Sequence, residues 1–292
     1  MDVLDFYFLL LIIKKMRFRT YYNIYYSHRI KKASIILKFY LIIVIPLRYL
    51  ITYFFSKKYN LDIISHKKSW LFSKDLNYLC EYFNTDKGSF FLDQFAKSTN
   101  KNQIPGHNYA SIYEKFLIDR SFFKNILEIG SFKGNAIAAF YFYFPNTNLY
   151  AADIYPDLFS YKSERIKNFY IDSSNEDSIK SFCNLLPKMD LIIEDAGHYL
   201  KDQIITLFIS FKNLNSKGLF IVEELDFPDT RKDMNKDNEH PTLKEILYLV
   251  SQSKEFYSKY VSEEDKNYFI KNFNKIHFFK GNFNEIAIIE KK

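Results

Sequence analysis

Two pairs of polar residues in the second half of the chain have side chains that bind a divalent ion or move a proton. Asp195 and His198 follow one apolar run, and Glu223 and Glu224 follow the next. If the runs are parallel strands, their carboxyl ends share one edge of a sheet and the four side chains meet there. Carboxylate oxygens suit Mg²⁺, and a histidine can serve as a general base. The pattern predicts a catalytic centre of Asp195 and His198, with Asp195, Glu223 and Glu224 as metal ligands. The alternative is that these carboxylates cap helices or lie in a solvated loop.

A turn earlier in the chain has two glycines at a spacing typical of nucleotide-binding folds. Residues Leu127–Asn135 read Leu-Glu-Ile-Gly-Ser-Phe-Lys-Gly-Asn. Gly130 permits a tight turn and a close approach of the backbone to a ligand, and Gly134 lets a helix begin close to the strand. Glu128 supports this turn, and its amides can face the polar part of a ligand. The middle glycine of G-x-G-x-x-G is absent, which disfavours a pyrophosphate ligand.

Acidic residues also end the next two predicted strands. Asp153 lies about 20 residues after the glycine turn, where a carboxylate accepts hydrogen bonds from both ribose hydroxyls of a nucleoside. Asp172 and Ser173 follow the third strand, where an adenine ring would lie. For this pair a second interpretation is equally open, namely that Asp172 caps the helix that begins at Glu176.

The elements that must position these residues alternate between short apolar runs and amphipathic segments from residue 123 onward. This alternation predicts an α/β, Rossmann-like, seven-stranded and mostly parallel sheet. The expected strands are 125–129, 148–153, 168–171, 190–194, 219–223, 275–279 and 285–290. The expected helices are 135–144, 157–166, 176–186, 200–214 and 241–253. Because no helix separates the last two strands, we expect an antiparallel C-terminal edge, which is typical of the methyltransferase variant of the fold.

Several of these motifs together resemble one enzyme family, the metal-dependent sugar O-methyltransferases of the mycinamicin and macrocin type, which are class I S-adenosylmethionine-dependent methyltransferases. The similarity extends over roughly residues 79–290. The motifs that carry it are Glu194–His198, Val222–Glu224, Thr85-Asp86-Lys87-Gly88, His107-x-Tyr109 and Tyr113-Glu114. In the family the upstream segment lies over the cofactor, so the resemblance implies that Thr85, Lys87 and Tyr109 contact it.

Two positions depart from the family pattern. Ala196 and Gly197 stand where the family more often has Gly-Ser, and Glu224 stands in place of the usual Asp. The longer Glu224 side chain places its carboxylate one methylene further from the backbone. Metal dependence is therefore less firmly implied than methyl transfer.

The resemblance implies methyl transfer from S-adenosylmethionine to a sugar or glycan hydroxyl, assisted by Mg²⁺. Glu128, Gly130, Gly134, Asp153, Asp172 and Ser173 would then hold the nucleoside. The metal would lower the pKa of the acceptor hydroxyl, and His198 would take its proton. Alternative readings are a methyltransferase for a small phenol or natural product, or a catalytically silent scaffold of the same fold. Nucleic acid is not an expected partner, since there is no motif for binding a flipped base.

The positive charge of the chain is concentrated at its beginning. Residues 1–68 contain 13 Lys and Arg and 3 Asp and Glu, a net charge of +10, whereas residues 69–292 have a net charge of −3. The basic residues alternate with the apolar stretches 3–13 and 35–55, which favours a helical segment on a membrane surface. Lys38, Pro46 and Arg48 disfavour a membrane span at 35–55. A span, or a soluble cap or dimerisation arm, are the alternatives.

The predicted organisation is therefore a basic apolar helical segment (1–68), a helical cap (69–120) and a methyltransferase domain (121–292). The two cysteines, Cys80 and Cys183, have neither metal-site nor disulfide-framework spacing, as in a reducing compartment. We expect a cytoplasmic protein, peripheral at the inner face of the membrane, where a lipid-linked glycan would be the acceptor. The sequence does not distinguish a monomer from a homo-oligomer.

Overall fold

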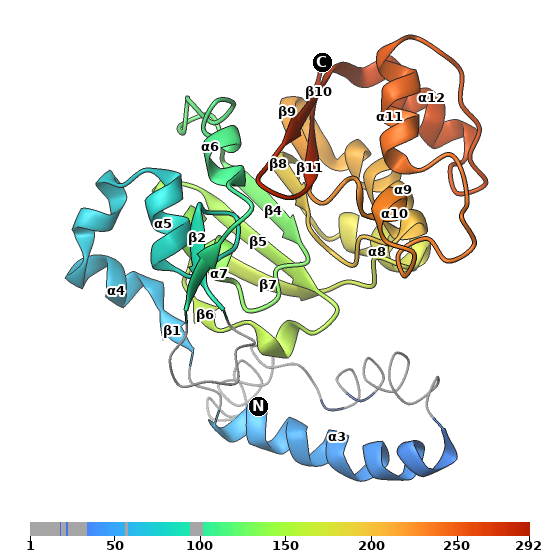
Figure 1. The fold of residues 1–292 in the computed structure, drawn as a ribbon. Helices are drawn as coiled ribbons and strands as arrows, with labels where there is room; N and C mark the ends of the chain where they lie inside the picture. The colour runs from blue at the N-terminus through green and yellow to red at the C-terminus, as the bar shows by residue number, and fades with distance from the viewer. Residues whose placement is uncertain (1–17, 19–21, 23–33, 56–57, 94–101) are drawn as a thin grey trace, which may run out of the picture. The chain divides into compact units, whose positions relative to one another are not determined.

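The computed structural model describes residues 18, 22, 34–55, 58–93 and 102–292 (Figure 1). The chain forms two compact units, Met1–Lys58 and Tyr59–Lys292. The described part of the first unit is mainly helix α3 (Ile35–Phe55), which contains Pro46. Most large apolar side chains at the start of α3 are exposed, including Ile36 and Ile43. None of the helices in the described part of the chain is long and apolar enough to cross a membrane. The predicted apolar stretch 3–13 lies outside the described residues.

The second unit is built on a seven-stranded sheet with the order β10-β11-β9-β8-β4-β5-β7. The strand bounds are β4 Asn125–Ile129, β5 Asn148–Asp153, β7 Ile166–Tyr170, β8 Met189–Glu194, β9 Leu214–Val222, β10 Phe273–Lys280 and β11 Glu285–Lys291. Strands β7, β5, β4, β8 and β9 are parallel, and β11 is antiparallel to both β9 and β10. The predicted Rossmann-like α/β sheet is confirmed. Its reversed strand, β11, lies inside the sheet, and β10 forms the edge.

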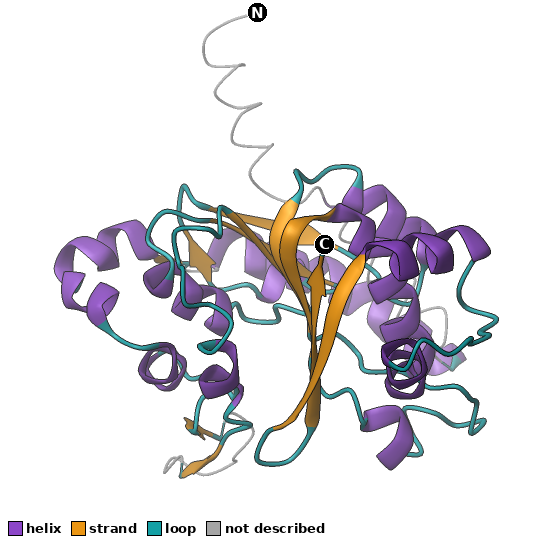
Figure 2. Ribbon diagram, turned by 90° about the horizontal axis from the view of Figure 1, so that it is seen from above, coloured by secondary structure: helices purple, strands orange, loops and turns teal. Residues whose placement is uncertain are grey.

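Helices cover both faces of this sheet (Figure 2). They are α7 (Asn135–Tyr143), α8 (Glu176–Cys183), α9 (Leu200–Ser210), α11 (Leu243–Ser251) and α12 (Glu263–Asn272). Successive residues of a strand point to opposite faces, so Ile126 and Ile193 belong to one hydrophobic core, while Leu127 and Ile192 belong to the other. The central strands are therefore buried on both sides, which explains their continuous apolar sequences.

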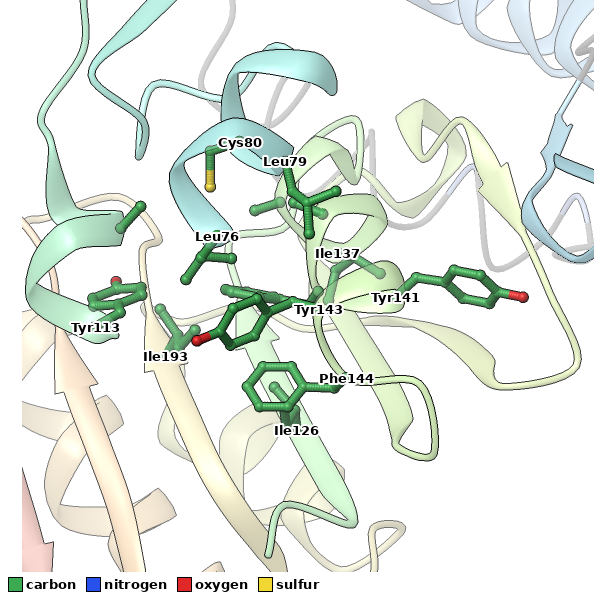
Figure 3. Close-up of a cluster of buried hydrophobic side chains, with 14 of the residues drawn as sticks. Leu76, Leu79, Cys80, Tyr113, Ile126, Ile137, Tyr141, Tyr143, Phe144 and Ile193 are labelled. Atoms are coloured by element: carbon green, nitrogen blue, oxygen red, sulfur yellow. The ribbon is translucent and has the colours of Figure 1, made fainter. Parts of the chain in front are cut away.

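Residues upstream of the sheet share the first of these cores. They form β1 (Tyr59–Asn60), α4 (Leu61–Lys67), α5 (Leu76–Tyr82), β2 (Phe90–Leu92), β3 (Gln103–Pro105) and α6 (Tyr109–Tyr113). Leu76 and Leu79 of α5 lie against the same cluster as Ile137 of α7 and Ile126 of β4 (Figure 3). This packing fixes the upstream segment over one face of the sheet, close to the carboxyl ends of its strands.

One predicted element is wrong, because residues 157–166 do not form a helix. They contain a 3₁₀ turn, Pro156–Leu158, and the short strand β6, Tyr161–Lys162, which pairs with β1. Asp62 of α4 accepts hydrogen bonds from the Ser163 hydroxyl (2.7 Å) and the Glu164 amide (3.0 Å). These contacts give the segment hydrogen-bond partners outside itself and compete with a helical conformation.

Two further differences from the prediction concern a helix that was not expected and the start of a strand. Helix α12 was not expected at all, although Ser262 caps it by accepting a hydrogen bond from the Asp265 amide. Strand β9 begins at Leu214, five residues earlier than predicted, so the preceding helix α9 ends at Ser210. The 3₁₀ turn Phe211–Asn213 joins them.

Candidate active site

The glycine turn joins β4 to α7 and brings two strand ends into contact. Gly130 has φ +95°, and a Cβ atom there would lie 1.9 Å from the carbonyl oxygen of Asp195. Only glycine therefore permits this approach between the ends of β4 and β8. Gly134, at φ +82°, is the N-cap residue of α7. A Cβ atom there would lie 2.3 Å from the ring of Phe159. The turn lies at the carboxyl edge of the sheet, where the amides of Ser131 and Phe132 donate hydrogen bonds to the carbonyl oxygen of Ala152 (3.1 Å) and to Asp153 Oδ2 (2.8 Å). Contact of this turn with a ligand stays a prediction.

Asp153 holds the same turn from the end of β5. Its side-chain oxygens accept hydrogen bonds from the amides of Phe132 (2.8 Å) and Tyr155 (2.7 Å). The side chain is buried, and burial raises the pKa of its carboxyl group. Asp153 therefore lies beside the turn in the position expected of a nucleoside contact, which stays a prediction.

Asp172 and Ser173 follow β7 at the same sheet edge. Asp172 Oδ1 accepts hydrogen bonds from the amide (3.0 Å) and hydroxyl (2.7 Å) of Ser174. Helix α8 is capped by Asn175, whose side chain accepts from the amides of residues 177 and 178. Capping of α8, one of the two interpretations of Asp172, is thus performed by another residue. The interpretation as an adenine contact remains.

Three side chains after β8 and β9 form a group that could hold a metal ion. Ligand atoms of Asp195, His198 and Glu224 all lie within 4.8 Å of one another. His198 Nε2 is 3.6 Å from Asp195 Oδ1 and 3.7 Å from Glu224 Oε2. His198 and Glu224 both have left-handed backbone conformations, with φ of +55° and +45°. Such backbone strain in non-glycine residues is concentrated at functional sites.

Two buried atoms of this group have no hydrogen-bond partner within the described structure, Glu224 Oε2 and His198 Nδ1. Burial raises the pKa of Glu224 well above its usual value, with the nearby Asp195 charge adding to this effect. Burial also lowers the pKa of His198, although Asp195 opposes this change. An unpartnered carboxylate oxygen and a neutral imidazole are what a cation site beside a general base requires.

Glu223 lies next to this group, but its carboxylate pairs with Lys87. Its two carboxylate oxygens are each 2.7 Å from Nζ of Lys87, and one also accepts a hydrogen bond from the Tyr113 hydroxyl. Lys87 also pairs with Asp195 Oδ2 at 2.5 Å and with Glu128 Oε1 at 3.5 Å. Burial opposes the charge on Lys87, but the three carboxylates outweigh it and raise the pKa of the ammonium group. The structure thus places Glu223 in an ion-pair cluster, beside the expected metal ligands.

The upstream segment reaches the same carboxylates from α6 and the loop before it. Tyr109 is fully buried, and its hydroxyl is 3.4 Å from Glu224 Oε1. Thr85 is also buried and pairs locally with Asp86. The structure therefore brings Lys87 and Tyr109, both expected to contact the cofactor, against the acidic cluster. Their predicted contact with a cofactor is untested.

His107 is a component of this site to which the sequence had given no role. Its Nε2 lies 3.5 Å from Glu224 Oε1, and its ring stacks on Tyr109 with 5.1 Å between ring centroids. Two imidazoles therefore flank the carboxylate of Glu224, His107 on one oxygen and His198 on the other. The signal was present in the His107-x-Tyr109 motif, but only the fold brings that motif to β9.

The strand order, the reversed strand β11 and the glycine turn define the fold of class I S-adenosylmethionine-dependent methyltransferases. Structures of the MycE methyltransferase from the mycinamycin biosynthetic pathway share it. One of them, a complex with Mg and SAH, has 18% sequence identity to this chain and a TM-score of 0.55. The superposition covers 75% of this chain and 55% of the MycE chain. A complex that also contains mycinamycin VI gives the same identity and TM-score and covers 54% of that chain. The predicted resemblance to this type of methyltransferase is confirmed.

Sequence comparison gives one curated relative, which matches part of the chain. The 8-demethyl-8-alpha-L-rhamnosyl tetracenomycin-C 2'-O-methyltransferase of Streptomyces olivaceus is 27% identical over an alignment of 128 residues, and the match covers 41% of this chain and 33% of the relative. No family model matches the chain. The chain therefore spans about a third of the curated relative and just over half of the MycE chain.

Proposed function

We propose that this protein is an S-adenosylmethionine-dependent O-methyltransferase that acts on a sugar hydroxyl of a glycan or a glycosylated natural product. The observation that carries the proposal is the group Asp195, His198 and Glu224, which lies beside the glycine turn of a methyltransferase fold. The similar proteins support it, since the Streptomyces relative is a rhamnosyl 2'-O-methyltransferase and MycE was crystallised with mycinamycin VI.

The methyl donor would lie across the carboxyl ends of β4, β5 and β7. Gly130 would let the turn approach its polar end, Asp153 would accept hydrogen bonds from its ribose hydroxyls, and Asp172 and Ser173 would lie beside its adenine. Asp153 already accepts two backbone amides, so its orientation is fixed before a ligand arrives. Such preorganisation reduces the entropy lost on binding.

The acidic group fits a divalent ion such as Mg²⁺. Mg²⁺ is usually held by one or two carboxylates together with water and substrate oxygens, and Asp195 and Glu224 provide these carboxylates on the side of His198. When bound, the ion would lower the pKa of the acceptor hydroxyl and orient it. Glu223, the third expected ligand, forms an ion pair with Lys87, which also pairs with Asp195.

His198 is the proposed general base. In the transfer, the bond between the methyl carbon and the sulfonium sulfur breaks as a bond from the acceptor oxygen to that carbon forms. The hydroxyl proton moves to His198, and the sulfur leaves as a neutral thioether. Burial lowers the pKa of His198, so the imidazole is neutral and able to accept the proton near pH 7. A general base at this position contributes about 10²–10⁴-fold to the rate.

The test is calorimetric titration of S-adenosylhomocysteine, with Mg²⁺ present and absent, into the wild type and two variants. Asp153→Ala should lose at least about tenfold in affinity, since it removes the proposed ribose contact. His198→Asn should bind normally but transfer methyl groups about 10²–10⁴-fold more slowly to glycan acceptors. Absence of binding to folded wild type would favour a silent scaffold. Turnover of small phenols with no turnover of glycans would favour the alternative substrate class.

We further propose that the N-terminal unit holds the protein on the cytoplasmic face of a membrane, where lipid-linked glycans would be its acceptors. Two observations support this. Residues 1–58, which form this unit, contain 11 Lys and Arg and 2 Asp and Glu, a net charge of +9, and α3 exposes large apolar side chains such as Ile36 and Ile43. Basic charge combined with exposed apolar surface is what binds an anionic lipid surface. Binding to phosphatidylglycerol vesicles is the measurement that tests it.

A further inference from the structure

The chain bends directly after β9, at Glu223 and Glu224. Successive residues of an extended strand point to opposite faces of a sheet, so a straight continuation of β9 would send these two side chains apart. Glu224 instead has a left-handed backbone conformation, with φ of +45°. Both carboxylates contact helix α6, Glu223 at the Tyr113 hydroxyl and Glu224 at the Tyr109 hydroxyl. The bend therefore brings both acidic side chains to one side of the candidate site.

Gln203 of α9 contacts this bend through its side-chain amide. Its Nε2 donates hydrogen bonds to the carbonyl oxygens of Glu223 (3.3 Å) and Glu224 (3.1 Å). Carbonyl oxygens only accept hydrogen bonds, so the nitrogen of this side chain, and not its oxygen, faces the bend. The Glu224 carbonyl also accepts a hydrogen bond from the Phe227 amide at 3.1 Å. One buried amide group thus bridges the two carbonyls of the bend.

Packing of α9 alone does not explain a glutamine at this position. Gln203 is completely buried, and its Oε1 has no hydrogen-bond partner among the described residues. A buried polar atom without a partner costs free energy, and an apolar side chain of the same length would avoid that cost. The two hydrogen bonds to the bend are therefore what this glutamine contributes.

The same turn of α9 adjoins the candidate general base. Helix α9 begins at Leu200, two residues after His198, and the Gln203 amide donates to the carbonyl oxygen of Tyr199 at 3.0 Å. His198 Nε2 lies 3.7 Å from Glu224 Oε2. Gln203 therefore connects the backbone that carries the base to the backbone that carries the carboxylates.

We propose that Gln203 is a positioning residue that holds the bend after β9 and thereby sets the carboxylates of Glu223 and Glu224 relative to His198. The proposal deepens the function proposed above and rests on the same metal site. It gives a role to a residue that the sequence did not single out.

The decisive variant is Gln203→Met in the full chain, which keeps the length of the side chain and removes both N–H donors. Mn²⁺ affinity, followed by the paramagnetic signal of the free ion, should fall at least about tenfold, because the carboxylates lose their fixed geometry. Hydrogen exchange of the backbone amides of residues 225–227 should be at least about tenfold faster. S-adenosylhomocysteine affinity should stay within about threefold of wild type, since the glycine turn is not in contact with Gln203.

Asn213→Leu is the matched control. Asn213 is also a buried side-chain amide that donates to a backbone carbonyl, that of Pro187 at 3.1 Å, but it lies at the amino end of β8. Urea unfolding measures the stability of both variants. The control should lose stability and keep wild-type Mn²⁺ affinity and wild-type exchange at residues 225–227, a separation that a merely structural role of Gln203 would not produce.

Wild-type Mn²⁺ affinity and exchange in a folded Gln203→Met variant would overturn the proposal, as would equal losses in the control. If Gln203→Met does not fold, Gln203→Asn replaces it, because asparagine keeps the amide but withdraws it by one methylene from the two carbonyls. A wild type that binds no Mn²⁺ would refute metal assistance in the proposed function. Hydrogen exchange then decides alone: faster exchange at the bend in the Gln203 variant only supports positioning, and unchanged exchange refutes it.

Discussion

At the scale of single residues, burial decides the protonation of the acids near the glycine turn. Burial is the main cause that raises the pKa of Glu128 to about 7, and the Asp195 charge adds to it, while the Lys87 ammonium opposes it. Glu128 Oε2 has no hydrogen-bond partner in the described structure. The folded state therefore binds this proton more tightly than the unfolded state, in which the pKa is near 4.5.

This shift has a sign that can be tested with Glu128→Gln. Because the folded pKa is raised, the free energy of unfolding of the wild type should fall as pH rises from about 4.5 through 7. The loss is about 1.4 kcal/mol per pKa unit. Glutamine mimics the neutral carboxyl, so the variant should lack this part of the pH dependence. Urea unfolding at pH 5 and pH 8 measures the difference, with the exposed Glu255→Gln as control. A variant with the wild-type slope would contradict the assignment.

The residues of the site were predictable from sequence to different degrees. Gly130 and Asp153 could be located from sequence because a strand followed by a turn is a local feature. Gly130 directly follows β4, and Asp153 is the last residue of β5. The pairs of Lys87 with Asp195 and Glu223 join residues 108 and 136 positions apart. No local pattern contains such contacts, so the sequence assigned Lys87 a cofactor contact by resemblance alone. Glu223 was grouped with Glu224 as a metal ligand because both follow a predicted strand and match the family motif, and that assignment stays a prediction.

At the scale of elements, prediction succeeded where burial alone decides the structure. Strands β4 and β5 were located at their observed bounds, since their apolar sequences can only be buried between two layers of helices. Residues 157–166 were wrongly expected to be helical because their conformation depends on Asp62, about a hundred residues upstream. Helix α12 could have been found, since Ser262 followed by Asp265 is a recognisable helix start.

The junction of β4 with β8 is the point where one element most depends on another. In Gly130→Ala, the new Cβ would meet the Asp195 carbonyl oxygen at 1.9 Å, at a φ of +95° that alanine disfavours. We expect a loss of about 1–3 kcal/mol in the free energy of unfolding and at least about tenfold weaker S-adenosylhomocysteine binding. Gly197→Ala is the control, since its Cβ would meet only side-chain atoms, those of Tyr199 at 3.1 Å and Asp202 at 3.8 Å. Equal behaviour of the two variants would show that the close approach is unimportant.

At the scale of the whole molecule, the two compact units predict separable activities. Residues 59–68 belong to the second unit, where Asp62 binds Tyr141, Ser163 and Glu164. The basic segment 1–68 is therefore best divided after Lys58, and a cut at residue 68 would remove α4 from the core. Circular dichroism and thermal unfolding of a chain reduced to residues 59–292 establish whether the second unit folds without the first.

If the N-terminal unit binds lipid, the chain of residues 59–292 should bind S-adenosylhomocysteine within about threefold of the full chain and lose binding to phosphatidylglycerol vesicles. A second, full-length variant with Ile36, Phe39 and Ile43 changed to Asn keeps the charge of the segment but removes exposed apolar side chains. It should retain only weak binding that salt abolishes, because exposed charges are screened. Vesicle sedimentation at low and high salt measures this. Equal sedimentation of all three proteins would show that the basic helical unit has another function, such as contact with a second protein chain.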